Sequence, residues 1–404
     1  MTAWATRELG LSVAHVAGAR PVTELIHPGL RRNPRRAQLW VSTVLGKHLP
    51  TPPADVIGAA DALADLVSEC LNGAEADVFG FCETATGLGH AVAARLGAAY
   101  LSSTRRAMPG VPVADAFEEG HSHATTHLLL PVPADAFDSD RPLVLVDDEV
   151  SSGATALDAI RALHRHYPRR RYVVASLVDM RNAAQRAADV GIDVEVEWVS
   201  LAQGETTVPA DLTARVAALP DPVFNPVGPA RGSWARVELP WPAAVPDGGR
   251  HGFRAADYAA FDAAVTAAGK QLRAQLPPGR PVIVLGHEEL MYLPVRIAAE
   301  LDVPSWFQTT TRSPAYVLDT PGFPMRRGFR FTAPESDPDV PRYLYNAAVD
   351  GVDPVLVLVV DEPADTPELV GPGGVVDVLT AAGEDVVVAV VAGADPEALR
   401  AARA

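Results

Sequence analysis

The stretch LVLVDDEVSSGATALDAI, residues 143–160, contains four apolar residues, two adjacent aspartates, a small hydroxylated turn and a helical pattern. A buried strand followed by a helix over 154–165 would place Asp147 and Asp148 at the carboxyl edge of a sheet, where open α/β folds bind ligands. The turn at 151–155 offers backbone N–H groups and hydroxyls to a phosphate at the helix N-terminus. Two carboxylates beside a phosphate favour sugar hydroxyls or a divalent cation as partners. The stretch therefore predicts a sugar phosphate ligand, although an ordinary strand-to-helix corner with a capping serine contains the same elements.

Composition bounds the class of protein. The chain has 404 residues, 48% hydrophobic and 21% charged, enough for two or three globular domains. A formal net charge of −16 opposes nucleic-acid binding, and the only strong basic cluster is RRNPRR (31–36). Cys70 and Cys82 are too few for a disulfide framework and lack metal-ligand spacing, as expected in a reducing cytoplasm. We therefore expect a cytoplasmic protein without a leader peptide or a membrane-spanning apolar run.

Apolar runs of strand length alternate with amphipathic helical patterns, which is typical of α/β domains with largely parallel sheets. In the first half we expect helices at 54–72, 87–96 and 154–165, and strands at 77–82, 98–103, 126–132, 142–147, 171–179 and 193–200. In the second half we expect helices at 255–275 and 289–301, and strands at 281–286, 303–309, 354–361 and 384–393. The intervening Pro- and Gly-rich segment is typical of a linker. We predict a first domain over 1–222 with an N-terminal hood over 1–53, a linker over 223–253 and a second α/β domain over 254–404.

The second half is a candidate copy of the first. Shifting the sequence by 205 positions (288 minus 83) lays ETATGLGHAVAARL (83–96) on EELMYLPVRIAAEL (288–301), with matching Glu, Leu and Ala residues. Chance similarity between two strand-helix units explains such matches equally well. The small hydroxylated turn at 151–155 has no counterpart after Asp361 and Glu362, where PADTPEL follows.

The acid pair and its loop resemble the signature that binds 5-phosphoribosyl 1-diphosphate (PRPP) in type I phosphoribosyltransferases. In that family four apolar residues precede an acidic pair and a Thr- or Ser-rich loop. The resemblance implies that Asp147 and Asp148 hold the ribose hydroxyls and, directly or through PRPP and water, a Mg²⁺ ion. It implies a 5′-phosphate on Ser151, Ser152, Gly153, Ala154 and Thr155.

Three further segments narrow the resemblance: RRNPRRAQLWVSTVLGKHLP (31–50), GFCETATGLGH (80–90) and FEEGHSHATTHLLLP (117–131). They look like the orotate-phosphoribosyltransferase-like proteins of tellurium-resistance-associated biosynthetic operons. Residues 311–314, Thr-Arg-Ser-Pro, match the motif that names the companion TRSP domain. The resemblance implies a type I phosphoribosyltransferase fold followed by a TRSP-like domain, a homodimer, and a role in a stress-related nucleoside-type pathway.

The resemblance also assigns the diphosphate of PRPP to two segments of the first domain. The first is the loop after the first core strand, and the second is the basic pair after the next strand. These residues are Glu83, Thr84, Ala85, Thr86, Gly87, Arg105 and Arg106. Glycines needed only for helix entry and ordinary exposed arginines are the alternative interpretations.

The loop GHSHATTH supplies His121, His123 and His127 within seven positions. The family implies a mobile lid here, with Glu119, His121 and His123 acting on the leaving group. A zinc site and a solvated loop remain alternatives. Residues 47–50, KHLP, belong either to a hood over the acceptor or to a helix end.

In the second domain, His287, Glu288, Arg312 and Arg327 are candidate ligand-binding residues. Because no phosphate loop follows Asp361, we expect that this domain does not bind PRPP as the first does. Completing the acceptor pocket and dimerisation are the alternatives.

The sequence therefore predicts a Mg²⁺-dependent phosphoribosyltransferase that joins the phosphoribosyl group of PRPP to a nitrogen of a nucleobase-like acceptor and releases diphosphate. Two other functions remain open: a PRPP-sensing regulator without turnover, and a nucleotide hydrolase or phosphorylase.

Overall fold

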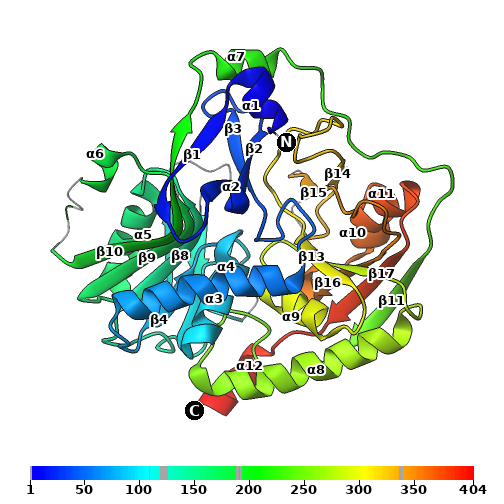
Figure 1. Cartoon of the computed structure of the whole chain (residues 1–404). Helices are drawn as coiled ribbons and strands as arrows, with labels where there is room; N and C mark the ends of the chain where they lie inside the picture. Colours follow the sequence, from blue (N-terminus) through cyan, green and yellow to red (C-terminus); the bar gives the residue numbers. More distant parts are fainter. Residues whose placement is uncertain (1, 109, 119–125, 188–190, 192, 336–339) are drawn as a thin grey trace.

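The computed structural model describes residues 2–108, 110–118, 126–187, 191, 193–335 and 340–404. Two α/β units lie side by side in Figure 1, one around each main sheet, with an N-terminal cap above them. The fold class predicted from the sequence is confirmed, because both main sheets are largely parallel and both are flanked by helices.

The first sheet contains six strands within the described part of the chain. Their order across the sheet is β1 (Ser12–Gly18), β10 (Glu195–Thr207), β9 (Arg171–Asp179), β8 (Leu143–Val150), β4 (Asp77–Gly80) and β5 (Ala99–Ser102). Only the pairing of β1 with β10 is antiparallel. Helices α3 (Pro53–Cys70) and α4 (Ala85–Leu96) cover one face, and α5 (Ala154–His166) covers the other. Strands covered on both faces bury both sets of side chains, which explains the unbroken apolar run at 143–146.

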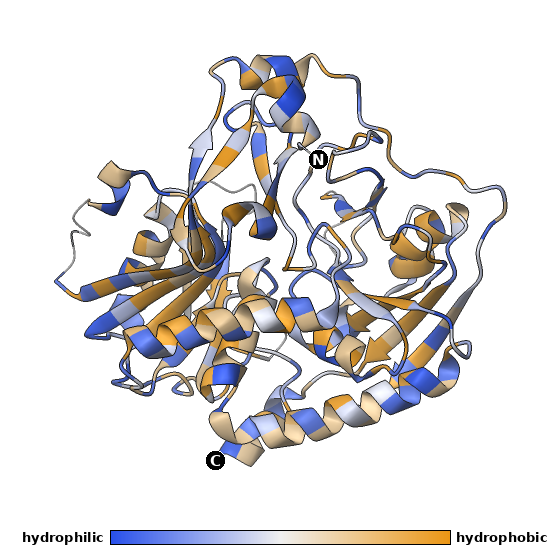
Figure 2. Ribbon diagram, in the orientation of Figure 1, coloured by the Kyte–Doolittle hydropathy of each residue, from blue (hydrophilic) through white to orange (hydrophobic). Residues whose placement is uncertain are grey.

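The second sheet repeats this plan. Its order is β11 (Trp234–Leu239), β17 (Val386–Val391), β16 (Val355–Asp361), β12 (Val282–Gly286) and β13 (Ser305–Thr309), all parallel. Helices α8 (Tyr258–Gln275) and α9 (Tyr292–Glu300) cover one face, and α11 (Val375–Ala381) covers the other. Figure 2 shows mostly apolar strands in both sheets and helices along which apolar and polar residues alternate.

Smaller elements complete the fold. The hairpins are β2 (Ile26–Leu30) with β3 (Gln38–Ser42), β6 (Asp115–Glu118) with β7 (Thr126–Leu129), and β14 (Gly328–Phe331) with β15 (Arg342–Tyr345). The short helices are α1 (Trp4–Leu9), α2 (Val22–Leu25), α6 (Ala183–Arg186), α7 (Leu212–Ala217), α10 (Pro367–Val370) and α12 (Pro396–Arg403), with 3₁₀ turns at Ala255–Asp257 and Glu362–Ala364. Among the described residues, no helix is both long and apolar enough to cross a membrane.

Strand order supports the interpretation of the second unit as a diverged copy. The order β10-β9-β8-β4-β5 has the same layout as β11-β17-β16-β12-β13. Helix α4 joins β4 to β5 as α9 joins β12 to β13, and the hairpins β6–β7 and β14–β15 follow at the same point in each unit. The copies differ at the outer strand: β10 follows β9 in the chain, whereas β11 precedes all its sheet partners.

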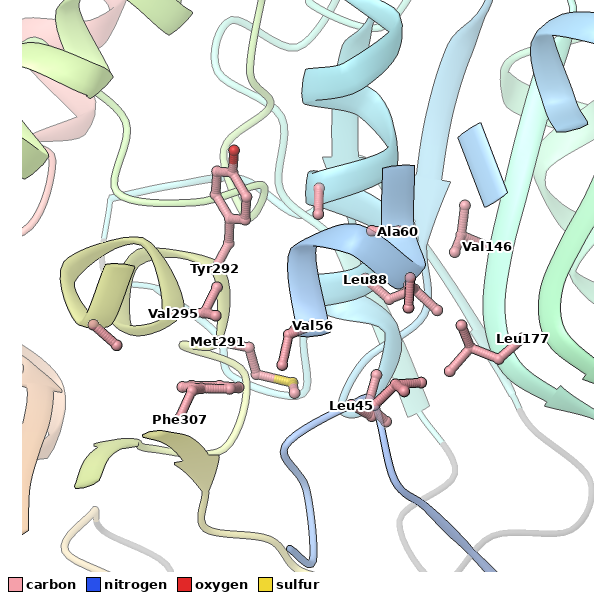
Figure 3. Packing of buried hydrophobic residues seen from close by; sticks show 14 of the residues in the cluster. Leu45, Val56, Ala60, Leu88, Val146, Leu177, Met291, Tyr292, Val295 and Phe307 are labelled. Atoms are coloured by element: carbon pink, nitrogen blue, oxygen red, sulfur yellow. The ribbon is translucent and has the colours of Figure 1, made fainter. Parts of the chain in front are cut away.

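The two units share one hydrophobic core. Figure 3 shows Val56 and Leu88 of the first unit beside Met291, Val295 and Phe307 of the second. Two backbone bridges join the units: Thr51 of the first pairs with Phe307 of the second, and Phe253, which precedes α8, pairs with Tyr100 of the first. Each unit is therefore joined to the other by backbone pairing as well as by side-chain packing.

One sequence expectation needs correction. The segment 223–253, predicted as a linker, contains β11, which pairs with β17 along its whole length. Its sequence WARVEL lies at the sheet edge and is mostly exposed, so it lacks the apolar run of an inner strand.

Candidate functional site

The acid pair lies at the carboxyl end of β8, the central strand of the first sheet. Asp147 and Asp148 are both half-buried, and the Asp148 N–H donates to Asp147 Oδ1 at 2.9 Å. The strand was expected to end at the first aspartate, but it continues to Val150 because its pairing with β9 extends to Asp179. Both carboxylates therefore lie on regular backbone that fixes their positions.

The loop at 151–153 joins this strand to α5. Ser151 and Ser152 are exposed, and the Ala154 N–H lies 3.3 Å from Ser152 Oγ. Gly153 adopts a φ of 85°, and a Cβ there would lie 3.0 Å from the Trp198 ring. Glycine is required on both grounds. The loop presents hydroxyls and the N-terminus of a 13-residue helix beside the acid pair.

Residues that sequence reasoning missed form the wall behind this loop. The Arg181 guanidinium lies 3.7 Å from the Trp198 ring centre and donates to both carboxylate oxygens of Asp179, at 3.0 and 2.9 Å. Burial raises the pKa of Asp179, but the hydrogen bonds from Arg181 outweigh this and hold the pKa below its ordinary value. Since these residues come from β9, β10 and the turn after β9, only the fold brings them together.

The basic segment 31–36 reaches the same edge. Arg36 donates to Glu149 Oε1 at 2.8 Å, and Arg32 pairs with Asp221. Burial raises the pKa of Glu149, and Arg36 partly opposes that rise. The ion pair of Arg36 with Glu149 therefore ties the N-terminal hood to β8.

The loop predicted to hold diphosphate lies between the acid pair and the second unit. Lys47 Nζ donates to Thr84 Oγ1 at 2.6 Å, which brings the predicted hood onto this loop. Glu83 Oε2 accepts from the Arg312 N–H at 3.2 Å, and Thr86 Oγ1 donates to the Glu289 carbonyl at 2.9 Å. Ala85 and Gly87 form the buried first turn of α4, where a Cβ on Gly87 would lie 2.8 Å from Met291.

The predicted basic pair divides between two environments. The Arg105 N–H donates to Glu289 Oε1 at 2.7 Å. Arg106 is half-buried and forms ion pairs with Glu288 at 3.2 Å, with Asp361 at 3.5 Å and with Glu335. These carboxylates raise the pKa of Arg106 although burial alone would lower it. Arg106 is therefore engaged by the second unit.

The lid prediction falls mainly outside the described residues, which exclude Glu119, His121 and His123. His127 is described and buried. Its Nδ1 lies 2.9 Å from Ser103 Oγ and 3.4 Å from Cys82 Sγ, and its ring stacks on Phe117. His127 therefore packs in the interior of the first unit.

Three of the four second-domain candidates lie together. Glu288 is fully buried and accepts from Arg312 at 2.8 Å, from Arg106 at 3.2 Å and from Arg342. Burial raises its pKa, but the surrounding cations reverse this and lower it strongly. His287 bridges Thr310 Oγ1 and Glu335 Oε1, each at 2.9 Å.

The fourth candidate lies elsewhere. Arg327 pairs with Glu384 at 2.6 Å and lies over the Phe329 ring. The structure therefore brings His287, Glu288 and Arg312 into one ion-pair cluster at the carboxyl edge of the second sheet and excludes Arg327 from it.

Each of the two α/β units matches a known family. Residues 25–205 match the family described as phosphoribosyl transferase (PRTase_2), and residues 247–379 match the TRSP domain that lies C-terminal to it. The chain therefore combines a phosphoribosyltransferase domain with a TRSP domain.

Solved structures similar to this chain include three phosphoribosyltransferases. The adenine phosphoribosyltransferase from Rhodothermus marinus is 19% identical, covers 45% of this chain and 95% of its own, and has a TM-score of 0.33. The adenine enzyme from Trypanosoma brucei is 14% identical, with 44% and 76% coverage and a TM-score of 0.34. A hypoxanthine-guanine phosphoribosyltransferase from Bacillus anthracis is 14% identical, with 39% and 82% coverage and a TM-score of 0.24. A search of the curated proteins found no significant match.

Proposed function

We propose that this chain transfers the phosphoribosyl group of PRPP to a nitrogen of a nucleobase-like acceptor, with Mg²⁺ as cofactor. The observation that carries the proposal is the half-buried pair Asp147 and Asp148 on β8, directly before an open loop at the N-terminus of α5. Carboxylates suit ribose hydroxyls, and the loop suits a phosphate.

In the proposed reaction the bond between the anomeric carbon and the diphosphate oxygen breaks, and a bond from the acceptor nitrogen to that carbon forms. Positive charge develops on the ribose ring, and negative charge develops on the leaving diphosphate. Asp147 and Asp148 orient the ribose and lie close to the developing positive charge. The loop 151–155 anchors the 5′-phosphate.

Segment 83–87 is proposed to receive the leaving diphosphate, with Arg105 as the basic residue. Lys47 is an added candidate, because its contact with Thr84 supplies a cation at this loop. Arg106 would have to exchange its carboxylate partners to contact the diphosphate, so its predicted role is the weakest of this set. Glu119, His121 and His123 keep the proposed role of a lid.

The carboxylate oxygens of Asp147 and Asp148 fit a hard cation such as Mg²⁺. Bound there, Mg²⁺ would neutralise charge on the diphosphate as it leaves. The two carboxylates would hold the ion directly or through PRPP and water. A homodimer and a place in a stress-related nucleoside-type pathway are further proposals that rest on the resemblance alone. A cytoplasmic location is a further proposal that rests on the sequence composition.

Product analysis tests the proposal directly. The purified full chain is incubated with PRPP, Mg²⁺ and a mixture of nucleobases, while diphosphate release and new nucleotides are followed by mass spectrometry. Base-dependent diphosphate release with a base plus ribose phosphate product is the expected result. Nucleotide breakdown without transfer would instead support the hydrolase or phosphorylase.

A PRPP-sensing protein without turnover is the second candidate function. The ion pairs of Arg106 favour it, because they occupy a basic residue assigned to the leaving group. PRPP binding without diphosphate release for any offered base would support this alternative over the transferase.

A further inference from the structure

In each unit, a carboxylate on the loop after an inner strand accepts a hydrogen bond from a backbone N–H of the other unit. The Arg105 N–H, after β5, donates to Glu289 of the second unit at 2.7 Å. In return, the Arg312 N–H, after β13, donates to Glu83 of the first unit at 3.2 Å. Each unit thus fixes the main chain of a loop in the other.

Glu289 makes more contacts with the first unit than this exchange requires. Besides binding the Arg105 N–H, its carboxylate accepts from Thr104 Oγ1 at 2.6 Å. Its carbonyl accepts from Thr86 Oγ1 at 2.9 Å. One residue of the second unit therefore joins both first-unit segments assigned to the diphosphate, the loop 83–87 and the residues 104–106.

These contacts determine what the second segment can offer an anion. The Glu289 carboxylate already uses the Arg105 N–H and the Thr104 hydroxyl. Glu289 thereby fixes the backbone that carries the Arg105 side chain. Hydrogen bonds to a charged acceptor are short and directional, so this arrangement holds the distance between the two segments.

We propose that Glu289 of the second unit is a positioning residue of the first unit's PRPP site, aligning Arg105 and the loop 83–87 for the diphosphate. The inference rests on the proposed function and assigns a role in it to the TRSP domain. Because Glu289 touches neither the acid pair nor the loop 151–155, its effect should be confined to the diphosphate half of the ligand.

Two ligands that differ only in the diphosphate provide the test. Titration calorimetry measures PRPP and ribose 5-phosphate on the full chain, in the presence of Mg²⁺, for the wild type and for Glu289→Ala. The variant should bind PRPP about tenfold more weakly, since two hydrogen bonds to a charged group are lost. Its affinity for ribose 5-phosphate should stay within about twofold of the wild type, a difference too small to reflect a lost hydrogen bond.

Three further variants separate positioning from damage to the fold. Glu289→Gln keeps an acceptor for the Arg105 N–H and should recover most of the lost PRPP affinity. Thr104→Val removes the hydroxyl contact with Glu289, together with the acceptor of the Arg106 N–H, but keeps the Glu289 contact with the Arg105 N–H, and should show a smaller, selective loss. Glu368→Ala removes an exposed carboxylate of α10 and should leave both ligands unaffected.

Several outcomes would overturn the proposal. Unchanged PRPP affinity in Glu289→Ala would remove Glu289 from the site, and an equal loss of both ligands would mean a structural role only. If Glu289→Gln bound PRPP as poorly as the alanine variant, positioning by hydrogen bonds would be wrong. If the wild type bound ribose 5-phosphate but not PRPP, or neither ligand, the proposed function itself would fail.

Discussion

At the scale of single residues, Asp147 and Asp148 are held by β8 and by one short hydrogen bond between them. Their half-buried carboxylates are not needed to fill the core, which lies at 143–146. The double substitution Asp147→Asn and Asp148→Asn should therefore leave the fold intact. It should weaken PRPP binding at least about tenfold, because charged acceptors for the ribose hydroxyls become neutral.

Calorimetry with PRPP measures this loss, and thermal unfolding checks the fold. Asp158→Asn, an exposed position on α5, is the matched control and should bind PRPP as the wild type does. Wild-type affinity in the double variant would exclude the acid pair from ligand binding.

The sequence alone located the acid pair and the loop because both lie within ten residues of one strand end. It missed the contact of the Arg181 guanidinium with the Trp198 ring. It also missed the ion pair between Arg36 and Glu149, two residues that lie 113 positions apart in the sequence. Such contacts depend on tertiary structure, and no local pattern marks them. Arg106 shows the same limit, because the described carboxylates with which its guanidinium forms ion pairs belong to the second unit.

At the scale of elements, the inner strands and their helices were predicted closely because a two-sided core demands continuous apolar runs. The strand at 171–179 was predicted to the residue. The edge strands β1 and β11 were missed, because both are largely exposed and their sequences carry little apolar signal. The hairpin β2–β3 was merged into the predicted hood.

The segment 247–253 has no regular secondary structure but joins the second unit to the first by backbone hydrogen bonds. Its residues pair with the first unit, since the Ser102 N–H donates to Gly249 and the Val132 N–H donates to His251. The His251 ring is buried, and its Nδ1 lies 3.1 Å from the Leu130 carbonyl. Burial lowers the pKa of His251 to about 4.

This shift gives a signed pH dependence. Because the folded pKa lies below the ordinary value of about 6.5, the unfolded chain binds more protons between pH 4 and 6.5. The free energy of unfolding should therefore fall on acidification through this window, with His251 contributing about 2 kcal/mol between pH 7 and pH 5. Urea unfolding of the wild type and of His251→Asn at both pH values measures it. The variant keeps an N–H donor at the Nδ1 position, and an identical acid loss in both proteins would contradict the assignment.

At the scale of the whole molecule, the second unit has the strand order of the first but a different chemistry at its carboxyl edge. Where β8 leads to an open loop, β16 leads to the 3₁₀ turn Glu362–Ala364. Asp361, at the end of β16, is buried in ion pairs with Arg106 and Arg250. The sequence predicted this divergence from the missing loop. It could not show that Arg106 of the first unit forms an ion pair with Asp361 at the carboxyl edge of the second sheet.

This asymmetry predicts one PRPP per chain. In the second unit the charges of Glu288 and Asp361 are already balanced by arginines, so a new anion would have to displace buried ion pairs, which is costly. Calorimetry on the full chain should give a stoichiometry near one, and Asp147→Asn with Asp148→Asn should weaken that single binding event at least about tenfold. Two binding events, or one that survives the double substitution at full strength, would mean that the second edge also accepts PRPP. A single event that weakens with loss of the acid pair would leave the second unit as a diverged copy whose contribution is to hold the loops of the first.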